Sequence, residues 1–269
     1  MEIINIDHFR EERLRIKKHT LNDVILQLRF DSLEEVLKGV PFEFQKSIKE
    51  EFPNISVQKR NSFLINLNPS DGSSTGATRS ESHSVYNYIS KEGNLKVSLC
   101  HDSLTLTSNS AYEGWDHFSK KFDYVLKAFL GHYDVKNLKR IGLRYRNMIS
   151  KKKLEIEGME WGELIKPAVL GYFSLKHLGN FSTEKLEVVS DIKQLDLGEC
   201  KLIFRTGITD TKEKEKEKVF YIDTDLYKLD SKAQLSVDTI IPTLRDMHEL
   251  SFPIFRDSIT DKLFNELCR

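Results

Sequence analysis

The stretch KRIGLRYRNMI, residues 139–149, alternates apolar and polar side chains with a period of two. In an extended chain, one face carries the apolar side chains of Ile141, Leu143 and Tyr145. The opposite face carries Arg140, Gly142, Arg144 and Arg146. This pattern is typical of a strand with one buried and one polar face, and it predicts a strand over residues 138–149.

A long amphipathic helix is predicted directly before this strand. Large apolar side chains recur there at steps of three and four residues: Trp115, Phe118, Phe122, Val125, Leu126 and Phe129. Gly131 stands where such a helix would end. Because so wide an apolar stripe is unstable in water, the helix is expected to pack against a sheet or another helix.

Further strands are expected on both sides of this helix and strand. Towards the N-terminus the predicted strands are residues 24–30, 55–59, 62–68, 85–90, 95–100 and 104–108, with short helices over 33–51 and a Gly- and Ser-rich loop over 68–82. Towards the C-terminus they are residues 171–177 running on towards 190, then 201–208 and 219–227. Helical spacing follows over 237–267, and Pro253 predicts a kink there or two consecutive helices. Residues 258–261 are expected to cap the final piece.

Strands that come in runs, and not in alternation with helices, indicate an α+β fold with antiparallel sheets and helices packed on one face of each. A polar connector near residue 155 suggests two subdomains of similar size. Residues 1–155 would form an N-terminal α+β subdomain. Residues 156–269 would form a β-meander followed by a long kinked C-terminal helix.

Composition narrows the classes of function. Among 269 residues, 41 are basic and 41 are acidic, so no overall field is expected to draw the chain to nucleic acid or to an anionic membrane. The cysteines Cys100, Cys200 and Cys268 are far apart, which argues against a disulfide framework and against a thiolate-rich zinc site. With no secretory-type apolar segment and no run of apolar residues long enough to span a membrane, a cytoplasmic protein is predicted.

Catalytic motifs are absent from the sequence. It contains no phosphate-binding glycine loop, no nucleophile elbow and no His-Glu-x-x-His pair, so no catalytic residue, cofactor or metal site is predicted. Cys100 and His101 are adjacent, and neighbours along a strand point to opposite faces. A turn histidine beside a cysteine at a strand end is therefore expected there.

Three polar residues remain weaker candidates for a site. Asp223 and Asp225 share one face of a predicted strand, which suits metal binding or acid–base work, although a solvated face explains them as well. His248 lies on the apolar stripe of the C-terminal helix, where a buried structural histidine is the more frequent case.

The strongest sequence signal for a ligand is basic. Residues 135–153 hold eight Lys or Arg and no Asp or Glu. The anion-binding candidates are Arg140, Arg144, Arg146, Lys151, Lys152 and Lys153. Guanidinium groups beside Gly142 would suit phosphate or a nucleic-acid backbone. The alternative is a face that is solvated or is salt-bridged to acids elsewhere, such as Asp223 and Asp225.

Several segments together resemble a known family. They are VILQLRF (24–30), GWDHFSKKFDYVLKAF (114–129), RIGLRYRNMI (140–149) and HELSFPIFRDSITDKLFNEL (248–267). In this order they resemble a sporadically distributed family of uncharacterised prokaryotic proteins of about this length, although residues 20–23 lack a proline expected before the first strand. The resemblance implies an intracellular protein, and its patchy distribution suggests antiviral defence. It brings no activity, cofactor or catalytic residue.

Two hypotheses of different class follow. The first is a non-enzymatic accessory or sensing protein that acts through protein partners or self-association, in a prokaryotic antiviral defence system. The alternative is a nucleic-acid- or nucleotide-binding module that uses residues 135–153. An enzyme of unrecognised type would require a pocket that joins Arg144, Asp223 and His248.

Overall fold

A computed structural model describes residues 6–63, 80–171, 182–211, 216–229 and 236–269. Within these ranges the strands form one antiparallel nine-stranded sheet in the order β2-β3-β4-β5-β1-β6-β9-β8-β7. The strands are β1 Leu21–Phe30, β2 Asn54–Phe63, β3 Ser80–Ile89, β4 Leu95–Cys100, β5 Ser103–Ser108, β6 Leu138–Ser150, β7 Val189–Asp196, β8 Lys201–Asp210 and β9 Lys218–Lys228.

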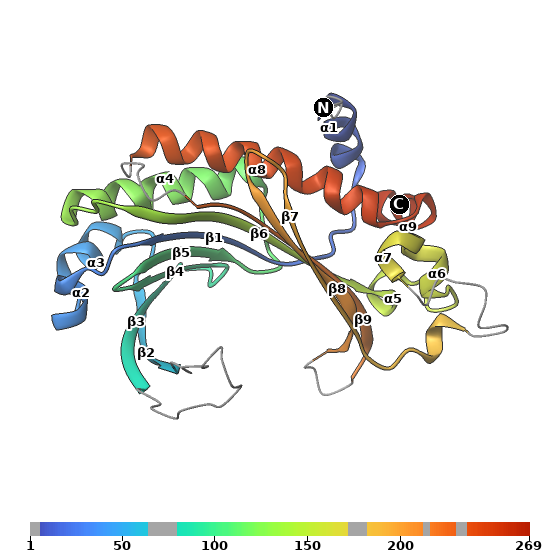
Figure 1. Cartoon of the computed structure of the whole chain (residues 1–269), viewed down its shortest axis with the longest axis horizontal. Helices are drawn as coiled ribbons and strands as arrows, with labels where there is room; N and C mark the ends of the chain where they lie inside the picture. The colour runs from blue at the N-terminus through green and yellow to red at the C-terminus, as the bar shows by residue number, and fades with distance from the viewer. Residues whose placement is uncertain (1–5, 64–79, 172–181, 212–215, 230–235) are drawn as a thin grey trace, which may run out of the picture.

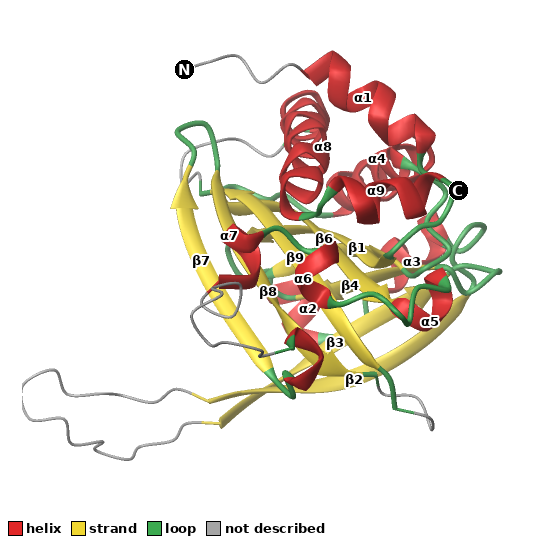
Figure 2. Ribbon diagram, turned by 90° about the vertical axis from the view of Figure 1, so that its right-hand side faces the viewer, coloured by secondary structure: helices red, strands yellow, loops and turns green. Residues whose placement is uncertain are grey.

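Two long helices cover one face of this sheet. Figure 1 shows α4 and α8 lying along it, while the strands towards both edges bend away from them. The helices are α1 Ile6–Arg15, α2 Glu34–Lys38, α3 Phe42–Ile48, α4 Trp115–His132, α5 Lys151–Leu154, α6 Trp161–Leu164, α7 Pro167–Leu170, α8 Val237–Ser258 and α9 Asp261–Cys268. Figure 2 shows α1 packed across α8 on the side away from the sheet.

The prediction of an α+β fold with helices on one face is confirmed. The prediction of separate sheets is wrong, because β6 pairs with β1 along one edge and with β9 along the other. A 13-residue strand offers enough backbone donors and acceptors on both edges to join the two runs of strands. One sheet therefore crosses the boundary predicted near residue 155, and the division into two subdomains stays a prediction.

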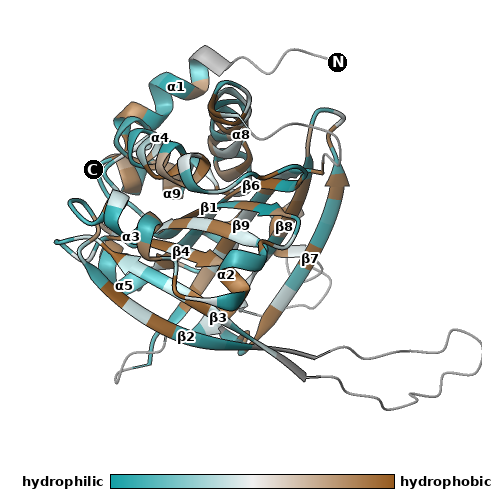
Figure 3. Ribbon diagram, turned by 90° about the vertical axis from the view of Figure 1, so that its left-hand side faces the viewer, coloured by the Kyte–Doolittle hydropathy of each residue, from teal (hydrophilic) through white to brown (hydrophobic). Residues whose placement is uncertain are grey.

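The core lies between the sheet and the two long helices. The alternation that predicted β6 is confirmed, because Ile141, Leu143 and Tyr145 are all buried. The predicted stripe of α4 is buried as well, with Phe122 and Phe129 fully inaccessible. Figure 3 shows hydrophobic and hydrophilic segments alternating along the strands, as expected where one face packs and the other meets solvent.

The C-terminal region forms two consecutive helices with a cap within 258–261, as predicted, but the break does not lie at Pro253. Helix α8 continues through Pro253 and ends at Ser258. The chain is then extended at Ile259, which forms a β-bridge with Ile165, and the Thr260 amide donates to the Leu164 carbonyl at 3.0 Å. The break is therefore set by pairing with a distant segment, which a local proline rule does not anticipate.

Thr260 caps the final helix, and its loss should be measurable. Its hydroxyl accepts from the Leu263 amide at 3.3 Å and donates to the Glu163 carbonyl at 2.7 Å. Thr260→Ala is expected to lower the free energy of unfolding by about 1 kcal/mol, the usual value of an N-cap. Urea unfolding checks this, and Thr260→Ser, which keeps the hydroxyl, should recover most of the loss.

Some local assignments differ from the sequence predictions. β2 is a single strand that ends at Phe63, where two strands were expected. The strand predicted over 171–177 and the loop predicted over 68–82 lie mostly outside the described residues. Neither α1 nor β7 was predicted. Nearly all of β7 is exposed, so it lacks the apolar alternation by which a strand is recognised. Among the described helices, none is long and apolar enough to cross a membrane.

Candidate ligand pocket and charged sheet face

The basic face of β6 is paired with carboxylates across the sheet. Arg144 Nε donates to Asp223 Oδ1 at 2.7 Å, and its Nη2 donates to the other oxygen of that carboxylate. Arg140 Nη2 donates to Asp225 Oδ1 at 2.6 Å. Arg146 Nη1 donates to Asp23 Oδ2 at 2.9 Å. Each strand arginine among the anion-binding candidates therefore has a carboxylate partner on β9 or β1.

This pairing assigns a structural role to the two aspartates. Asp223 and Asp225 are 5% and 8% exposed, so their carboxylates require the guanidinium groups that reach them. Arg205 of β8 lies 3.8 Å from Asp223 and adds a second cation. Guanidinium groups therefore hold both oxygens of Asp223 and one oxygen of Asp225. The salt-bridged alternative considered from the sequence matches these contacts.

The lysines of α5 do not extend the charged face into one cationic surface. Lys151 is buried, with its ammonium 4.2 Å from the centre of the Trp161 ring, and it donates to the Met159 carbonyl. Lys152 and Lys153 are exposed. Their backbone amides donate to the side-chain oxygens of Glu217 and Ser150, respectively. The predicted anion-binding set is therefore divided between an ion-pair network and a capped turn.

His248 lies on the other side of the sheet from Arg144 and Asp223. Its Nδ1 is 2.7 Å from the hydroxyl of Tyr145, which points to the helix-covered face of β6. Arg144, one residue earlier, points to the opposite face. The structure thus brings Arg144 and Asp223 together and leaves His248 apart, so the three do not form a common pocket.

His248 is instead the centre of a cluster built from four elements. Arg13 of α1 places Nη1 2.9 Å from His248 Nε2, and the indole of Trp115 at the start of α4 stacks on the imidazole with ring centres 4.6 Å apart. The Tyr145 hydroxyl lies 3.4 Å from that of Tyr112. Helices α1, α4 and α8 and strand β6 therefore converge on this histidine.

The two hydrogen bonds of His248 have a fixed direction. A guanidinium can only donate, so His248 Nε2 accepts from Arg13 and the proton of the neutral ring resides on Nδ1. Nδ1–H then donates to the Tyr145 oxygen. Either phenol can be the donor in the contact between Tyr145 and Tyr112, and the chain ends at the Tyr112 hydroxyl.

Burial and charge keep this chain neutral. Burial, reinforced by the charges of Arg13 and Arg10, lowers the pKa of His248 to about 3. Burial raises the pKa of Tyr112 to about 12, and it raises the pKa of Tyr145 well above its ordinary value. At neutral pH the imidazole is uncharged and both phenols keep their protons.

A pocket of about 660 Å³ opens beside the cluster. Its volume falls within the range of about 300–1,000 Å³ that is typical of small-molecule sites. Aromatic rings and a few polar groups line it, among them Arg13, Tyr112, Trp115, Tyr145, Asn147, His248 and Phe252. Asn147 accepts at 2.8 Å from the Thr20 hydroxyl, which fixes its amide in the wall.

Sequence reasoning did not identify this pocket. Trp115 and Tyr145 were read as packing residues, and Arg13 lies on the helix that was not predicted. The spacing of Phe9, Arg13 and Ile16 by four and three residues is the signal that could have indicated α1. Convergence of four segments that are far apart in the sequence carries no local signal.

Comparison with known proteins adds no functional assignment. No protein-family model matches the chain, and no curated protein is found to be similar to it. The family resemblance therefore stays a prediction, and the functional argument rests on the geometry.

Proposed function

We propose that this protein is a non-enzymatic sensing protein that binds a small planar ligand in the pocket between α1, α4, α8 and β6. The observation that carries the proposal is the chain from Arg13 through His248 and Tyr145 to Tyr112. It ends at the pocket wall on the Tyr112 hydroxyl, which can donate or accept, beside aromatic side chains. Such a wall suits a compact aromatic molecule that carries a hydrogen-bond acceptor.

Binding is favoured over catalysis by the state of His248. Both ring nitrogens are engaged, Nε2 by Arg13 and Nδ1 by Tyr145. A pKa of about 3 makes the imidazole a poor base at neutral pH, far from the value near the working pH that a general base needs. Rigid polar groups of this kind orient a ligand and provide selectivity.

The output of the sensor is proposed to pass through α1 to a protein partner. Helix α1 contributes Arg13 to the pocket and is held to α8 by ion pairs, Arg10 with Glu249 at 3.1 Å and Glu12 with Arg256 at 3.2 Å. A ligand that competes for Arg13 would alter these contacts. From the family resemblance, we expect the partner to belong to a cytoplasmic antiviral defence system. Purification of the protein with its partners from the native cell, with and without ligand, tests this expectation.

The chain provides its own fluorescent reporter of ligand binding. The sequence contains two tryptophans. Trp115 lines the pocket, whereas Trp161 is buried against Phe220. In a Trp161→Phe background, a planar ligand is expected to change the emission of Trp115 in a saturable way. The probes are a panel of nucleobases, nucleosides and aromatic acids, preceded by native mass spectrometry of the protein purified from its own cells.

Tyr112→Phe supplies the specific test of the donor. Removing one hydrogen bond should weaken a ligand that accepts it by roughly 2- to 10-fold. Tyr124→Phe is the matched control, because the Tyr124 hydroxyl donates at 2.7 Å to the Ser47 carbonyl and does not line this pocket. The proposal is rejected if no panel compound changes Trp115 emission and no small molecule co-purifies, or if the two variants weaken binding equally.

The nucleic-acid alternative stays a prediction, and the ion pairs of Arg140, Arg144 and Arg146 count against it. Phosphate contacts would have to displace buried carboxylates that these arginines already hold. Any binding of DNA or RNA that is lost when Arg144 and Arg146 are reversed in charge, and that falls steeply with salt, would restore this alternative.

A further inference from the structure

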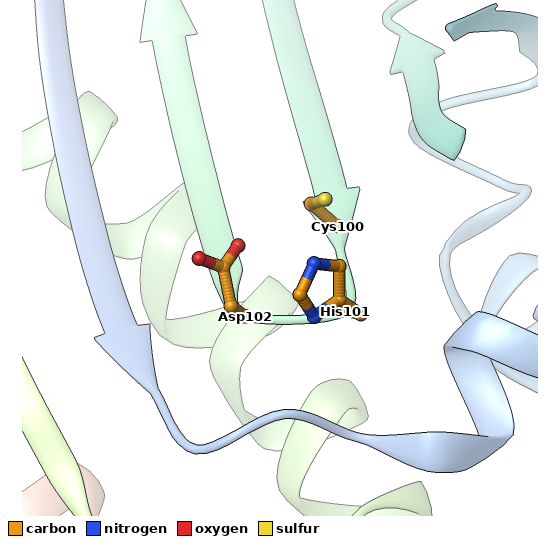
Figure 4. A group of neighbouring side chains, drawn as sticks. All are labelled: Cys100, His101 and Asp102. Carbon is orange, nitrogen blue, oxygen red and sulfur yellow. The ribbon is translucent and has the colours of Figure 1, made fainter. Parts of the chain in front are cut away.

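A second cluster of chemically active side chains lies at the turn between β4 and β5, apart from the pocket. Three consecutive residues, Cys100, His101 and Asp102, each place one potential ligand atom within 4.8 Å of the others. Figure 4 shows the three side chains gathered at the turn, with the Cys100 sulfur above the His101 imidazole and the Asp102 carboxylate beside it.

The structure confirms the predicted turn histidine beside a strand-end cysteine. Neighbours within a strand point to opposite faces, but Cys100 is the last residue of β4 and pairs with Ser103, the first residue of β5. His101 and Asp102 form the two-residue turn between them. Strand alternation ends at such a turn, so consecutive side chains can converge.

A second imidazole, on the neighbouring strand, lies beside this turn. The ring of His83 in β3 packs on that of His101, with ring centres 4.3 Å apart. The turn thus gathers one thiol, one imidazole and one carboxylate, and the His83 ring packs on the His101 imidazole from β3. This donor set is one that Zn²⁺ accepts, since it binds cysteine sulfur, histidine nitrogen and carboxylate oxygen with four ligands in a tetrahedron.

We propose that Cys100, His101 and Asp102, completed by His83, form a binding site for Zn²⁺. Binding would release the Cys100 proton to solvent and form a metal–thiolate bond. The ion would link β3 to the β4–β5 turn near one edge of the sheet. This assignment is independent of the ligand pocket, which lies on the helix-covered side around His248.

The surrounding contacts hold the ligands in place. The Ser32 hydroxyl lies 3.0 Å from His101 Nδ1, so a metal would bind through Nε2, the arrangement by which second-shell groups commonly orient histidine ligands. Arg29 donates to Asp102 Oδ2 at 2.8 Å, and the Ser103 hydroxyl donates to Oδ1 at 3.1 Å.

The turn backbone is fixed as well. The Phe30 amide donates to the Asp102 carbonyl at 3.1 Å, and the Leu33 amide donates to the His101 carbonyl at 2.8 Å. The segment between β1 and α2 therefore clamps both turn residues. A preformed site of this kind needs only side-chain rotations to bring ligand atoms from within 4.8 Å of one another to tetrahedral contact with an ion.

Charge is compatible with a dication. A thiolate and the Asp102 carboxylate supply two negative charges, and Arg29 balances one of them in the absence of metal. Burial opposes ionisation of Asp102, but the hydrogen bond and charge of Arg29 prevail and lower the pKa of its carboxyl group.

The test uses Co²⁺ as a spectroscopic substitute for Zn²⁺. Metal-free protein titrated with Co²⁺ is expected to show thiolate-to-metal charge-transfer absorption and the visible bands of tetrahedral cobalt. One equivalent of Zn²⁺ should abolish both signals. Cys100→Ser should remove the charge-transfer band. It should also lower the affinity for Zn²⁺, measured by competition with a chelating dye, by on the order of 100-fold or more, since even second-shell changes reach that size.

Cys200→Ser is the matched control. Cys200 is also a buried free thiol beside a strand end, and burial raises its thiol pKa as it does that of Cys100. This variant should bind Co²⁺ and Zn²⁺ as the parent protein does. If Cys100→Ser does not fold, His83→Ala, at a partly exposed position, takes its place and should weaken Zn²⁺ binding measurably.

Three outcomes would overturn the assignment. The first is a Co²⁺ spectrum without a thiolate band, and the second is equal loss of binding in the Cys100 and Cys200 variants. The third, unchanged Zn²⁺ affinity in His83→Ala, removes His83 as the fourth ligand. Thermal unfolding adds an independent readout, because a ligand of the native state should raise Tm in the parent protein and not in Cys100→Ser.

Discussion

Asp223→Asn is expected to lower the free energy of unfolding by about 2–3 kcal/mol. The substitution keeps the shape of the side chain but removes the charge that holds Arg144, and Arg205 at 3.8 Å loses its carboxylate as well. A fully buried pair that loses one partner costs about 3–5 kcal/mol. The smaller value applies here because the Arg144 side chain is 33% exposed and can be hydrated in part.

Urea unfolding of three variants separates this effect from a general loss of surface charge. Asp191→Asn removes an exposed carboxylate that pairs with Lys193, and its effect should stay within about 0.5 kcal/mol. The double variant Asp223→Asn with Arg144→Met should be more stable than Asp223→Asn alone, because the unpaired cation is gone. Similar losses in the Asp223 and Asp191 variants would contradict a buried ion-pair network.

Acidification should destabilise the protein through His248. The pKa of this imidazole is about 3 in the folded chain and 6.5 in the unfolded chain, so the unfolded state takes up the proton first as pH falls. The contribution of the neutral ring is therefore complete above pH 6.5 and is lost progressively towards pH 3. Between about pH 7.5 and pH 5, this one group should remove about 2 kcal/mol of stability.

The variant His248→Gln isolates that contribution. Glutamine can accept a hydrogen bond from Arg13 and donate one to Tyr145, but it does not titrate. As the pH falls from about 7.5 to 5, the difference in free energy of unfolding between parent and variant should therefore shrink by about 2 kcal/mol. The measurement is chemical unfolding of both proteins at several pH values. A parallel pH dependence in the two proteins would show that the His248 imidazole is not held neutral by the fold.

The elements best predicted from the sequence are those whose periodicity reports burial directly. β6 and α4 alternate or repeat cleanly, and their apolar faces are buried as expected. β7 was missed because it is mostly exposed at the sheet edge. The end of α8 was misplaced because the Ile165–Ile259 bridge decides it, and no residue near Pro253 encodes that contact.

Prediction of the sites was limited by the same distinction between local and distant contacts. The pairing of the β6 arginines with Asp223 and Asp225 could be anticipated as an alternative, since strand faces follow from alternation. Which strands are neighbours could not be deduced, and this decides that Arg144 meets Asp223 while His248 meets Tyr145. The Cys100–Asp102 cluster escaped because alternation fails at a two-residue turn.

The position of β6 between β1 and β9 also governs the order in which the chain can assemble. Strands β2 to β5 form one run of sequential neighbours and β9 to β7 another, so each can form by short loop closures. β1 cannot find its second partner until β6, more than a hundred residues later in the chain, has been synthesised. High contact order of this kind slows folding, so during translation β1 would carry one unpaired edge until β6 leaves the ribosome.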